Sequence, residues 1–362
     1  MRSFLFPLLL LGIGSFFPFH TLKATSFLRE EEIKASKNHW KPFTLEEEQK
    51  HPEFFSKLKT LLQEGTLHRI QEGDGGAYIV KDATGKGHFI IKPTDEDIYC
   101  LNNPKNYHSS SLEERARKNI PLYQSAQREA FCYELAILSG LEAITPKTYL
   151  STLFLPEFFL FSQNGSLEKL CSVQEYIQEG ISLRHLLQNL FSSHIKDEDL
   201  EPYFEEEDFS LISLFTWLTF DNDAHAGNIL AYPKKTNSPS FTVYGLKKID
   251  NSLSFPEKNT DFFHFLMHFP HAKAPLSSSI REKILHLPLE ILEKSLERFG
   301  LESSFLAFKE RVYVLQELAK RPTITYYEIG LRLLLLEEDN GLTLALSLLS
   351  LEELKNLSPS FL

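Results

Sequence analysis

The sequence predicts a two-lobed α+β fold, with a sheet-rich N-terminal lobe and a mainly helical C-terminal lobe. Its 362 residues exceed what a single hydrophobic core usually serves, which favours two lobes that share a cleft. Short apolar runs and glycine turns are concentrated before residue 179, whereas helical spacing of apolar residues dominates after it. The predicted organisation is a leader over residues 1–24, a helical lead-in over 25–66, a sheet lobe over 67–178 and a helical lobe over 179–362.

The composition is that of a globular protein with an acidic balance of charge. Hydrophobic residues make up 42% of the chain, charged residues make up 24%, and the formal net charge is -11. Such a charge repels polyanions, so we expect no nucleic-acid partner. Cys100, Cys132 and Cys171 lack the paired spacing of a zinc site or a disulfide framework. The oligomeric state is left open by the sequence.

The first 24 residues have the outline of a signal peptide or an N-terminal anchor. Met1 and Arg2 precede an apolar run from Phe4 to Phe19, and the small residue Ala24 follows. Cleavage near Ala24 would place the protein in the cell envelope or outside the cell, or allow its delivery into another cell. A retained anchor would instead bring the N-terminus into contact with a membrane.

A charged, helix-forming stretch with a capping signal at Thr44 leads into a series of hairpins. The three glycines Gly73, Gly75 and Gly76 occupy the first hairpin turn. Glycine lets backbone N–H groups approach a phosphate closely, so this turn is a candidate phosphate site. A hairpin turn without any ligand explains the glycines as well. Strands are predicted over 67–71, 77–80 and 88–92.

Lys92 ends an apolar strand, where an inward-facing lysine requires an anionic partner to offset desolvation. The helix predicted over 125–139 carries two candidates, Glu129 and Glu134, between which the spacing does not decide. We expect Glu129 to hold Lys92 against the phosphates of a nucleotide. A lysine exposed at the strand end is the alternative.

A connection between the lobes is expected near the end of the sheet-rich part. Glu175 and Ile177 lie in the last predicted strand of that part, and their backbone would then be available to an adenine edge. This placement rests on the order of the segments alone. The strands predicted here cover residues 147–150, 157–161 and 171–177.

The densest group of polar residues follows an apolar helix predicted over 211–220. In a phosphoryl-transfer site, an aspartate such as Asp223 positions the attacking hydroxyl, and an asparagine such as Asn228 turns back to bind Mg²⁺. A strand over 241–249 then leads to Asp250. A hairpin would bring Asp250 beside Asn228, so that a carboxylate and an amide oxygen share a hard cation.

Each of these features has a simpler explanation when it is taken singly. Aspartate and asparagine favour turns for local reasons, so residues 221–228 and 250–251 could be ordinary turns. A metal hydrolase built on His225, Asp221, Asp223 and Asp250 would also account for the acidic residues. It would leave the glycine hairpin, Lys92 and the order of the parts without a reason.

Taken together, four segments resemble the phosphatidylinositol 3- and 4-kinase superfamily, and most closely the type II phosphatidylinositol 4-kinases and their bacterial relatives. The segments are GDGGAYIVKDATGKGHFIIKP, QREAFCYELAILSGLEAITPKTYL, DNDAHAGNIL and KKIDNSLSF. The family's lysine followed by proline matches Lys92, and its Arg-Glu pair matches Arg128 and Glu129. The family catalytic motif DRHxxN corresponds to residues 223–228, and its metal-binding aspartate corresponds to Asp250.

The resemblance implies a kinase-like fold that binds ATP and Mg²⁺ and phosphorylates an inositol lipid or a protein hydroxyl. It implies that Asp223 positions the acceptor and that His225 braces the catalytic loop. The remaining site residues implied are Gly73, Gly75, Gly76, Lys92, Glu129, Glu175 and Ile177 for the nucleotide, with Asn228 and Asp250 for the metal.

Two positions depart from the family pattern. Ala224 stands where arginine is common, and the segment after Asp250, residues 254–259, is not basic. The second departure weakens the lipid assignment and leaves protein hydroxyls as acceptors. A pseudokinase, which keeps the fold and binds without turnover, is the contrasting class of function.

Two further patterns are assigned to packing. His264, His268 and His271 lie at helical spacing beside phenylalanines, which favours a half-buried helix over a metal site. The leucine-rich segment after residue 330 is interrupted by Glu337 and Glu338, so buried terminal helices are expected rather than a membrane span.

Overall fold

The computed structural model describes residues 48–100, 102–105, 119–160, 167–234, 242–259, 264–337 and 341–347. The predicted leader, the capping signal at Thr44 and the C-terminal residues after 347 lie outside the described residues. Among the described residues, none of the helices combines the length and the hydrophobicity of a membrane span.

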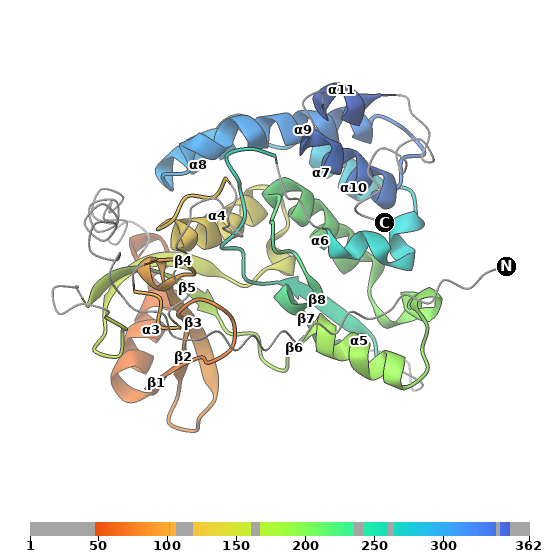
Figure 1. The fold of residues 1–362 in the computed structure, drawn as a ribbon. Coiled ribbons are helices and arrows are strands. Elements are labelled where there is room, and N and C mark those ends of the chain that lie inside the picture. Colours follow the sequence, from red (N-terminus) through yellow and green to blue (C-terminus); the bar gives the residue numbers. More distant parts are fainter. Residues whose placement is uncertain are drawn as a thin grey trace, which may run out of the picture.

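The N-terminal lobe is built on one antiparallel sheet with the strand order β1-β2-β3-β5-β4. Its helices are α3 (Pro52–Glu64) and α4 (Ser125–Leu138), which lie against the sheet in Figure 1. Its strands are β1 (Thr66–Arg69), β2 (Tyr78–Lys81), β3 (Gly87–Pro93), β4 (Thr148–Phe154) and β5 (Glu168–Glu175).

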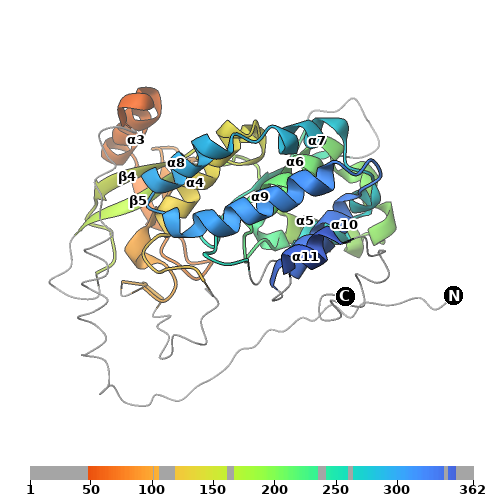
Figure 2. The same cartoon turned by 90° about the horizontal axis from the view of Figure 1, so that it is seen from above.

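Alternation along β3 gives the sheet two different faces. Phe89 and Ile91 are buried against α3, where Phe55 and Leu58 complete a small core. Lys92 therefore points to the opposite face, because successive side chains of a strand alternate. Figure 2 shows α3 at the margin of the molecule, on the outer side of the sheet.

The C-terminal lobe is mainly helical and carries a small sheet with the order β6-β7-β8. The strands are β6 (Ile181–Ser182), β7 (Ile229–Pro233) and β8 (Tyr244–Lys248). The helices are α5 (Leu183–Ser192), α6 (Glu206–Thr219), α7 (Ser278–Leu285), α8 (Leu289–Arg298), α9 (Phe305–Ala319), α10 (Tyr326–Leu334) and α11 (Gly341–Leu346).

Helix α6 forms the centre of the helical lobe. Every residue from Asp208 to Thr219 is buried, which is expected of a helix that is apolar on nearly all sides. Helices α7, α9 and α10 pack around it, and the same hydrophobic core reaches α4 of the other lobe. The molecule is thus a two-lobed α+β fold, as predicted.

Two local predictions differ from the structure. Residues 157–160 form no strand, because the pairing of β4 with β5 ends at Phe154, and Pro156 two residues further on cannot donate to a ladder. The segment that holds His264, His268 and His271 folds into two short 3₁₀ turns, Phe265–His268 and Pro270–Lys273, instead of one helix. Pro270 begins the second of these turns and prevents one continuous helix through the segment.

Candidate active site

Lys92 is the point at which the two lobes meet. Its Nζ lies 2.6 Å from Glu129 Oε1 on α4 and 2.9 Å from Asp250 Oδ1, just beyond β8. The Glu129 side chain is only 1% exposed, whereas that of Asp250 is 44% exposed. The expected ion pair between Lys92 and Glu129 is therefore present, and Asp250 is held beside it.

The electrostatics of this triad follow from burial opposed by charge. Burial by itself lowers the pKa of the Lys92 ammonium, but the carboxylates of Asp250 and Glu129 outweigh it and raise the pKa. Burial raises the pKa of Glu129. Burial acts in the same direction on Asp250, but Lys92 overcomes it and lowers the pKa of that carboxyl to about 2. Lys92 and Asp250 are therefore both charged near neutral pH.

Glu134, the other candidate partner of Lys92, serves a different contact. Its Oε1 lies 2.8 Å from Arg298 NH2 on α8, so it ties α4 to the helical lobe. Residues five apart on a helix point in clearly different directions, and only one of the two carboxylates can face the sheet.

The candidate catalytic loop starts where α6 ends. Phe220 adopts a left-handed backbone (φ 50), which stops the helix and turns the chain. The Asn228 amide nitrogen then donates to both the backbone oxygen and the carboxylate Oδ2 of Asp223, at 2.9 Å in each case. The loop thus closes on itself. The side-chain oxygen Oδ1 of Asn228 is the other polar atom of this amide, and these two hydrogen bonds do not use it.

Asp223 is half-exposed at this loop. Burial raises the pKa of its carboxyl, His225 and Lys248 oppose that rise, and Asp221 and Asp250 reinforce it. A carboxyl with a raised pKa is better suited to accept a proton near neutral pH than an ordinary aspartate.

His225 supports the loop from within. Its Nδ1 accepts the backbone N–H of Gly227 at 2.9 Å and lies 3.3 Å from Arg184 NH2 on α5. Its Nε2 lies 3.4 Å from Asp223 Oδ1. These contacts are those of a side chain that orients the loop and its aspartate.

The hairpin of β7 and β8 brings the metal-binding candidates together. Ile229 pairs with Lys248, and the N–H of Ile249 donates to the Asn228 carbonyl at 2.9 Å. Asp250 follows directly, with a left-handed backbone (φ 55) that aspartate tolerates better than most residues. Asn228 directly precedes β7 and Asp250 follows the end of β8. Because these strands are antiparallel, the two residues lie at the same end of the hairpin.

A carboxylate and an amide oxygen are hard ligands of the kind that Mg²⁺ takes when substrate phosphates and water complete its shell. The half-exposed Asp250 carboxylate and the oriented Asn228 amide fit this use. Among the described residues there is no cluster of three or more His, Cys, Asp or Glu side chains that could hold a metal. The donors present fit a magnesium–nucleotide complex better than a resident transition metal.

A buried ion pair, which the sequence did not single out, connects the loop of residues 221–228 to the segment that contains Asp250. Lys248 Nζ lies 2.6 Å from Asp221 Oδ2, and both side chains are fully buried. Asp221 Oδ1 accepts the backbone N–H of Asp223, while Lys248 donates to the carbonyls of Ile249 and Asp250. A polar residue at an otherwise inward-facing position of β8 was the only signal for this pair.

Arg128 has a second supporting role that spacing did not reveal. The side chain is fully buried, donates from NH1 to the Ser254 carbonyl at 2.7 Å, and also contacts the Phe255 carbonyl. It thereby ties α4, one residue before Glu129, to the segment that follows Asp250.

The glycine turn lies at the Lys92 end of the sheet, because Tyr78 pairs with Ile91. Gly73 has φ 73, a left-handed conformation that favours glycine. Gly76 is required for a different reason: a Cβ there would lie 2.4 Å from Glu96 Oε2, and its N–H already donates to the Glu96 carbonyl at 2.7 Å. Of the three glycines, Gly76 is thus fixed by packing.

Glu175 and Ile177 lie where the chain passes from the last strand of the N-terminal lobe, β5, to the first strand of the helical lobe, β6. Glu175 ends β5 and pairs with Phe89, so its side chain lies on the α3 face of the sheet, away from Lys92. Only its backbone could contribute to a site in the cleft. Within the described residues, the Ile177 backbone makes no hydrogen bond.

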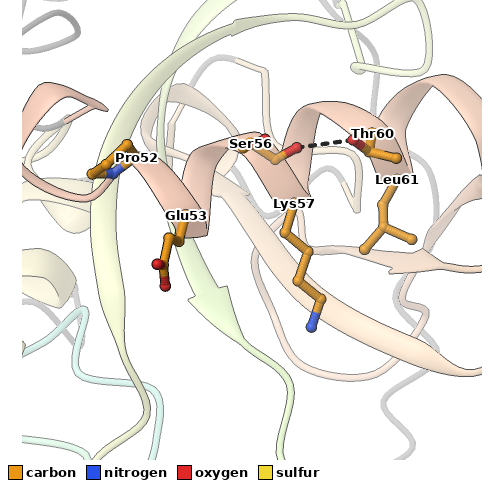
Figure 3. A pocket seen from close by; sticks show the side chains of 6 residues that line it. All are labelled: Pro52, Glu53, Ser56, Lys57, Thr60 and Leu61. Carbon is orange, nitrogen blue, oxygen red and sulfur yellow. Dashed lines mark hydrogen bonds between the residues drawn. The ribbon is translucent and has the colours of Figure 1, made fainter.

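A separate hollow of about 640 Å³ lies on the outer surface of α3 (Figure 3). Its wall is formed by one face of this helix, with Thr60 hydrogen-bonded to the Ser56 carbonyl. The lining residues are Pro52, Glu53, Ser56, Lys57, Thr60 and Leu61. It contains none of the candidate catalytic residues, and α3 packs on the opposite face of the sheet from Lys92.

Comparison with known proteins finds weak similarity to plant phosphatidylinositol 4-kinases. The chain is 26% identical to phosphatidylinositol 4-kinase gamma 5 of Arabidopsis thaliana over 219 residues, which cover 60% of this chain and 34% of the relative. It is 26% identical to phosphatidylinositol 4-kinase gamma 3 of the same plant over 270 residues, covering 69% and 44%. The chain thus spans less than half of these relatives, and no protein-family model matches it.

Two solved structures show distant likeness. The Rio2 kinase–ADP/Mg²⁺–phosphoaspartate complex from Chaetomium thermophilum is 14% identical, with a TM-score of 0.37 over 79% of this chain and 86% of that one. The structure of WaaP in complex with acyl carrier protein is 12% identical, with a TM-score of 0.31 over 72% and 92%. In sequence, the chain is thus similar to part of proteins that are named as kinases.

Proposed function

We propose that the chain is a Mg²⁺-dependent kinase that transfers the γ-phosphoryl group of ATP to an alcohol. The observation that carries this proposal is the convergence of Lys92, Glu129 and Asp250 within hydrogen-bonding distance, beside the loop of Asp223 and Asn228. These groups come from both lobes and from segments far apart in the sequence. Turn formation alone gives no reason for them to meet.

In this proposal Lys92 binds the nucleotide phosphates and Glu129 holds it in place. Asn228 and Asp250 hold Mg²⁺, which neutralises charge on the phosphates when it is bound. Because Lys92 contacts Asp250 directly, nucleotide binding must replace part of that contact. Asp223 positions the acceptor hydroxyl and receives its proton, and His225 keeps the carboxylate oriented.

Phosphatidylinositol is the acceptor that we favour, because the plant relatives described above are named as phosphatidylinositol 4-kinases. We also propose that, within this class, the chain is related to the type II phosphatidylinositol 4-kinases and their bacterial relatives, on the motifs given above. A protein hydroxyl is the competing acceptor, since Glu257 balances Lys258 and residues 254–259 have no net positive charge to attract a phosphorylated headgroup. A cleaved leader would make this a kinase of the cell envelope or an exported kinase.

The test is incubation of residues 25–362 with Mg²⁺ and γ-labelled ATP, offered phosphatidylinositol liposomes and a protein mixture in parallel. We expect label on the lipid. Asp223→Asn should retain Mg²⁺-dependent ATP binding and lower transfer by at least about 100-fold, the size of a lost acid–base group. Asp250→Asn should lose the Mg²⁺ dependence of binding as well.

Each outcome names a different function. Label on protein alone would replace the lipid by a protein acceptor. ATP binding without any transfer would indicate a pseudokinase. Phosphate or ester release without ATP, dependent on His225, would indicate a hydrolase.

A further inference from the structure

The segment that follows β3 folds back onto the glycine turn between β1 and β2. The Asn103 side chain donates from Nδ2 to the Asp74 carbonyl at 2.8 Å. Lys105 Nζ donates to the Glu72 carbonyl at 2.7 Å and also to the Gly73 carbonyl. Three successive carbonyls of the turn are therefore held by two side chains from one short segment.

These hydrogen bonds to the carbonyls also set the direction of the backbone N–H groups in the same peptide units. In a trans peptide the C=O and the following N–H point in opposite directions, and the described chain has no cis bond. With the carbonyls of residues 72–74 held by Asn103 and Lys105, the N–H groups of Gly73, Asp74 and Gly75 point the other way. Within the described residues, none of these three N–H groups has a hydrogen-bond acceptor.

Successive N–H groups directed to one side, with a left-handed residue among them, form a concave anion-binding arrangement. Gly73 supplies the left-handed residue, at φ 73. The three groups lie at the end of the sheet that carries Lys92.

The other end of the turn is fixed more deeply. The Glu96 carbonyl accepts the Gly76 N–H, and the Glu96 carboxylate is fully buried. That carboxylate contacts Lys169 Nζ and Tyr78 Oη, each at 2.7 Å. The turn therefore has a rigid end at Gly76, and the direction of its remaining amides depends on Asn103 and Lys105.

We propose that Asn103 and Lys105 are positioning residues that preset the turn to bind the phosphates of a nucleotide. The ligand named here rests on the proposed kinase function, whereas the support of the turn does not. Lys105 acts through the loop carbonyls rather than as a phosphate ligand, because its ammonium already donates on the side opposite to the N–H groups.

The test uses Lys105→Met, which removes the donors and keeps the length, with Lys105→Arg as the conservative variant. Lys86→Met is the matched control, because it removes the same charge from the exposed turn between β2 and β3. Loss of hydrogen bonds from a charged donor should weaken Mg²⁺-ATP binding about tenfold in Lys105→Met. Adenosine, which lacks phosphates, should bind all four proteins equally, and Lys105→Arg should restore ATP binding.

A parallel measurement of backbone motion by NMR relaxation at Gly73, Asp74 and Gly75, without nucleotide, tests the support of the turn alone. Larger motion of these amides in Lys105→Met than in Lys86→Met is expected, because Lys105 holds the carbonyls of Glu72 and Gly73. Equal ATP affinity and equal motion in these two variants would overturn the proposal, as would an equal loss of ATP and adenosine binding. If the unaltered chain binds no nucleotide, the kinase assignment fails, and the motion of these amides alone decides whether Lys105 holds the turn.

Discussion

The candidate catalytic loop and the glycine turn are supported in opposite ways. The catalytic loop is braced by Asp221 and Lys248, an ion pair that is fully buried in the helical lobe. The glycine turn is held by Lys105, which is only partly buried and donates to backbone carbonyls. One loop is therefore part of the core, and the other is a surface segment positioned by side chains.

Because of this difference, substitutions in the catalytic loop should change mainly the free energy of unfolding, and substitutions at the glycine turn should change mainly the affinity for Mg²⁺-ATP. Breaking a buried ion pair leaves an uncompensated charge in the interior, which costs free energy of folding. Removing a donor at the surface exposes the freed carbonyl to water, which costs little folding energy but releases the local geometry. Denaturation and nucleotide-binding measurements should thus distinguish substitutions in the two regions.

The largest effect is expected for Lys248→Met, which leaves the Asp221 carboxylate buried without its cation. The free energy of unfolding should fall by about 3–5 kcal/mol, measured by chemical denaturation. The double variant Asp221→Asn with Lys248→Met should recover most of this loss, because no unpaired charge remains. Wild-type stability of the single variant would show that the pair does not support the loop.

A smaller effect is expected where the two lobes meet. Glu129→Gln leaves Asp250 as the anionic partner of Lys92, so the lysine is drawn toward the metal-binding carboxylate. The dissociation constant of Mg²⁺-ATP should rise about tenfold, or about 1.4 kcal/mol. Glu134→Gln on the same helix, which contacts Arg298 instead, is the matched control and should bind normally. Equal affinities for the two variants would contradict the assignment of Glu129.

The smallest effect concerns the buried polar groups of the helical lobe under acid. Burial lowers the pKa of His264 to about 3, from an ordinary value of 6.5, and its Nδ1 accepts the Trp217 N–H at 3.1 Å. Because the unfolded chain binds the proton first, stability is present above pH 6.5 and is lost as the pH falls toward 3.

The contribution of His264 should amount to about 1 kcal/mol between pH 6.5 and about pH 5.5. It is measured as the difference in pH slope of unfolding free energy between the unaltered chain and His264→Asn. His268 and His271, whose pKa values burial also lowers, are common to both proteins. Identical slopes would mean that His264 is not buried as described.

The order of the elements was predictable because local patterns determine it. Alternation and glycine turns predicted β1, β2 and β3 within a residue or two, and helical spacing predicted α4 over nearly its full length. The strand expected at 157–161 failed because a short apolar run carries no information about whether a partner strand is available. The histidine segment failed because Pro270 outweighs the spacing of its apolar residues.

Residue chemistry and order along the chain were enough to predict the two-lobed α+β class and the candidate residues Lys92, Asp223, Asn228 and Asp250, because these signals are local. The choice between Glu129 and Glu134 required the folded molecule, since both lie on one helix and the sheet meets just one of its faces. The pairing of Asp221 with Lys248, and of Lys105 with the glycine turn, likewise became visible only in the fold. Such contacts join residues that are distant in sequence, and no local pattern records which buried charges or carbonyls the fold will bring together.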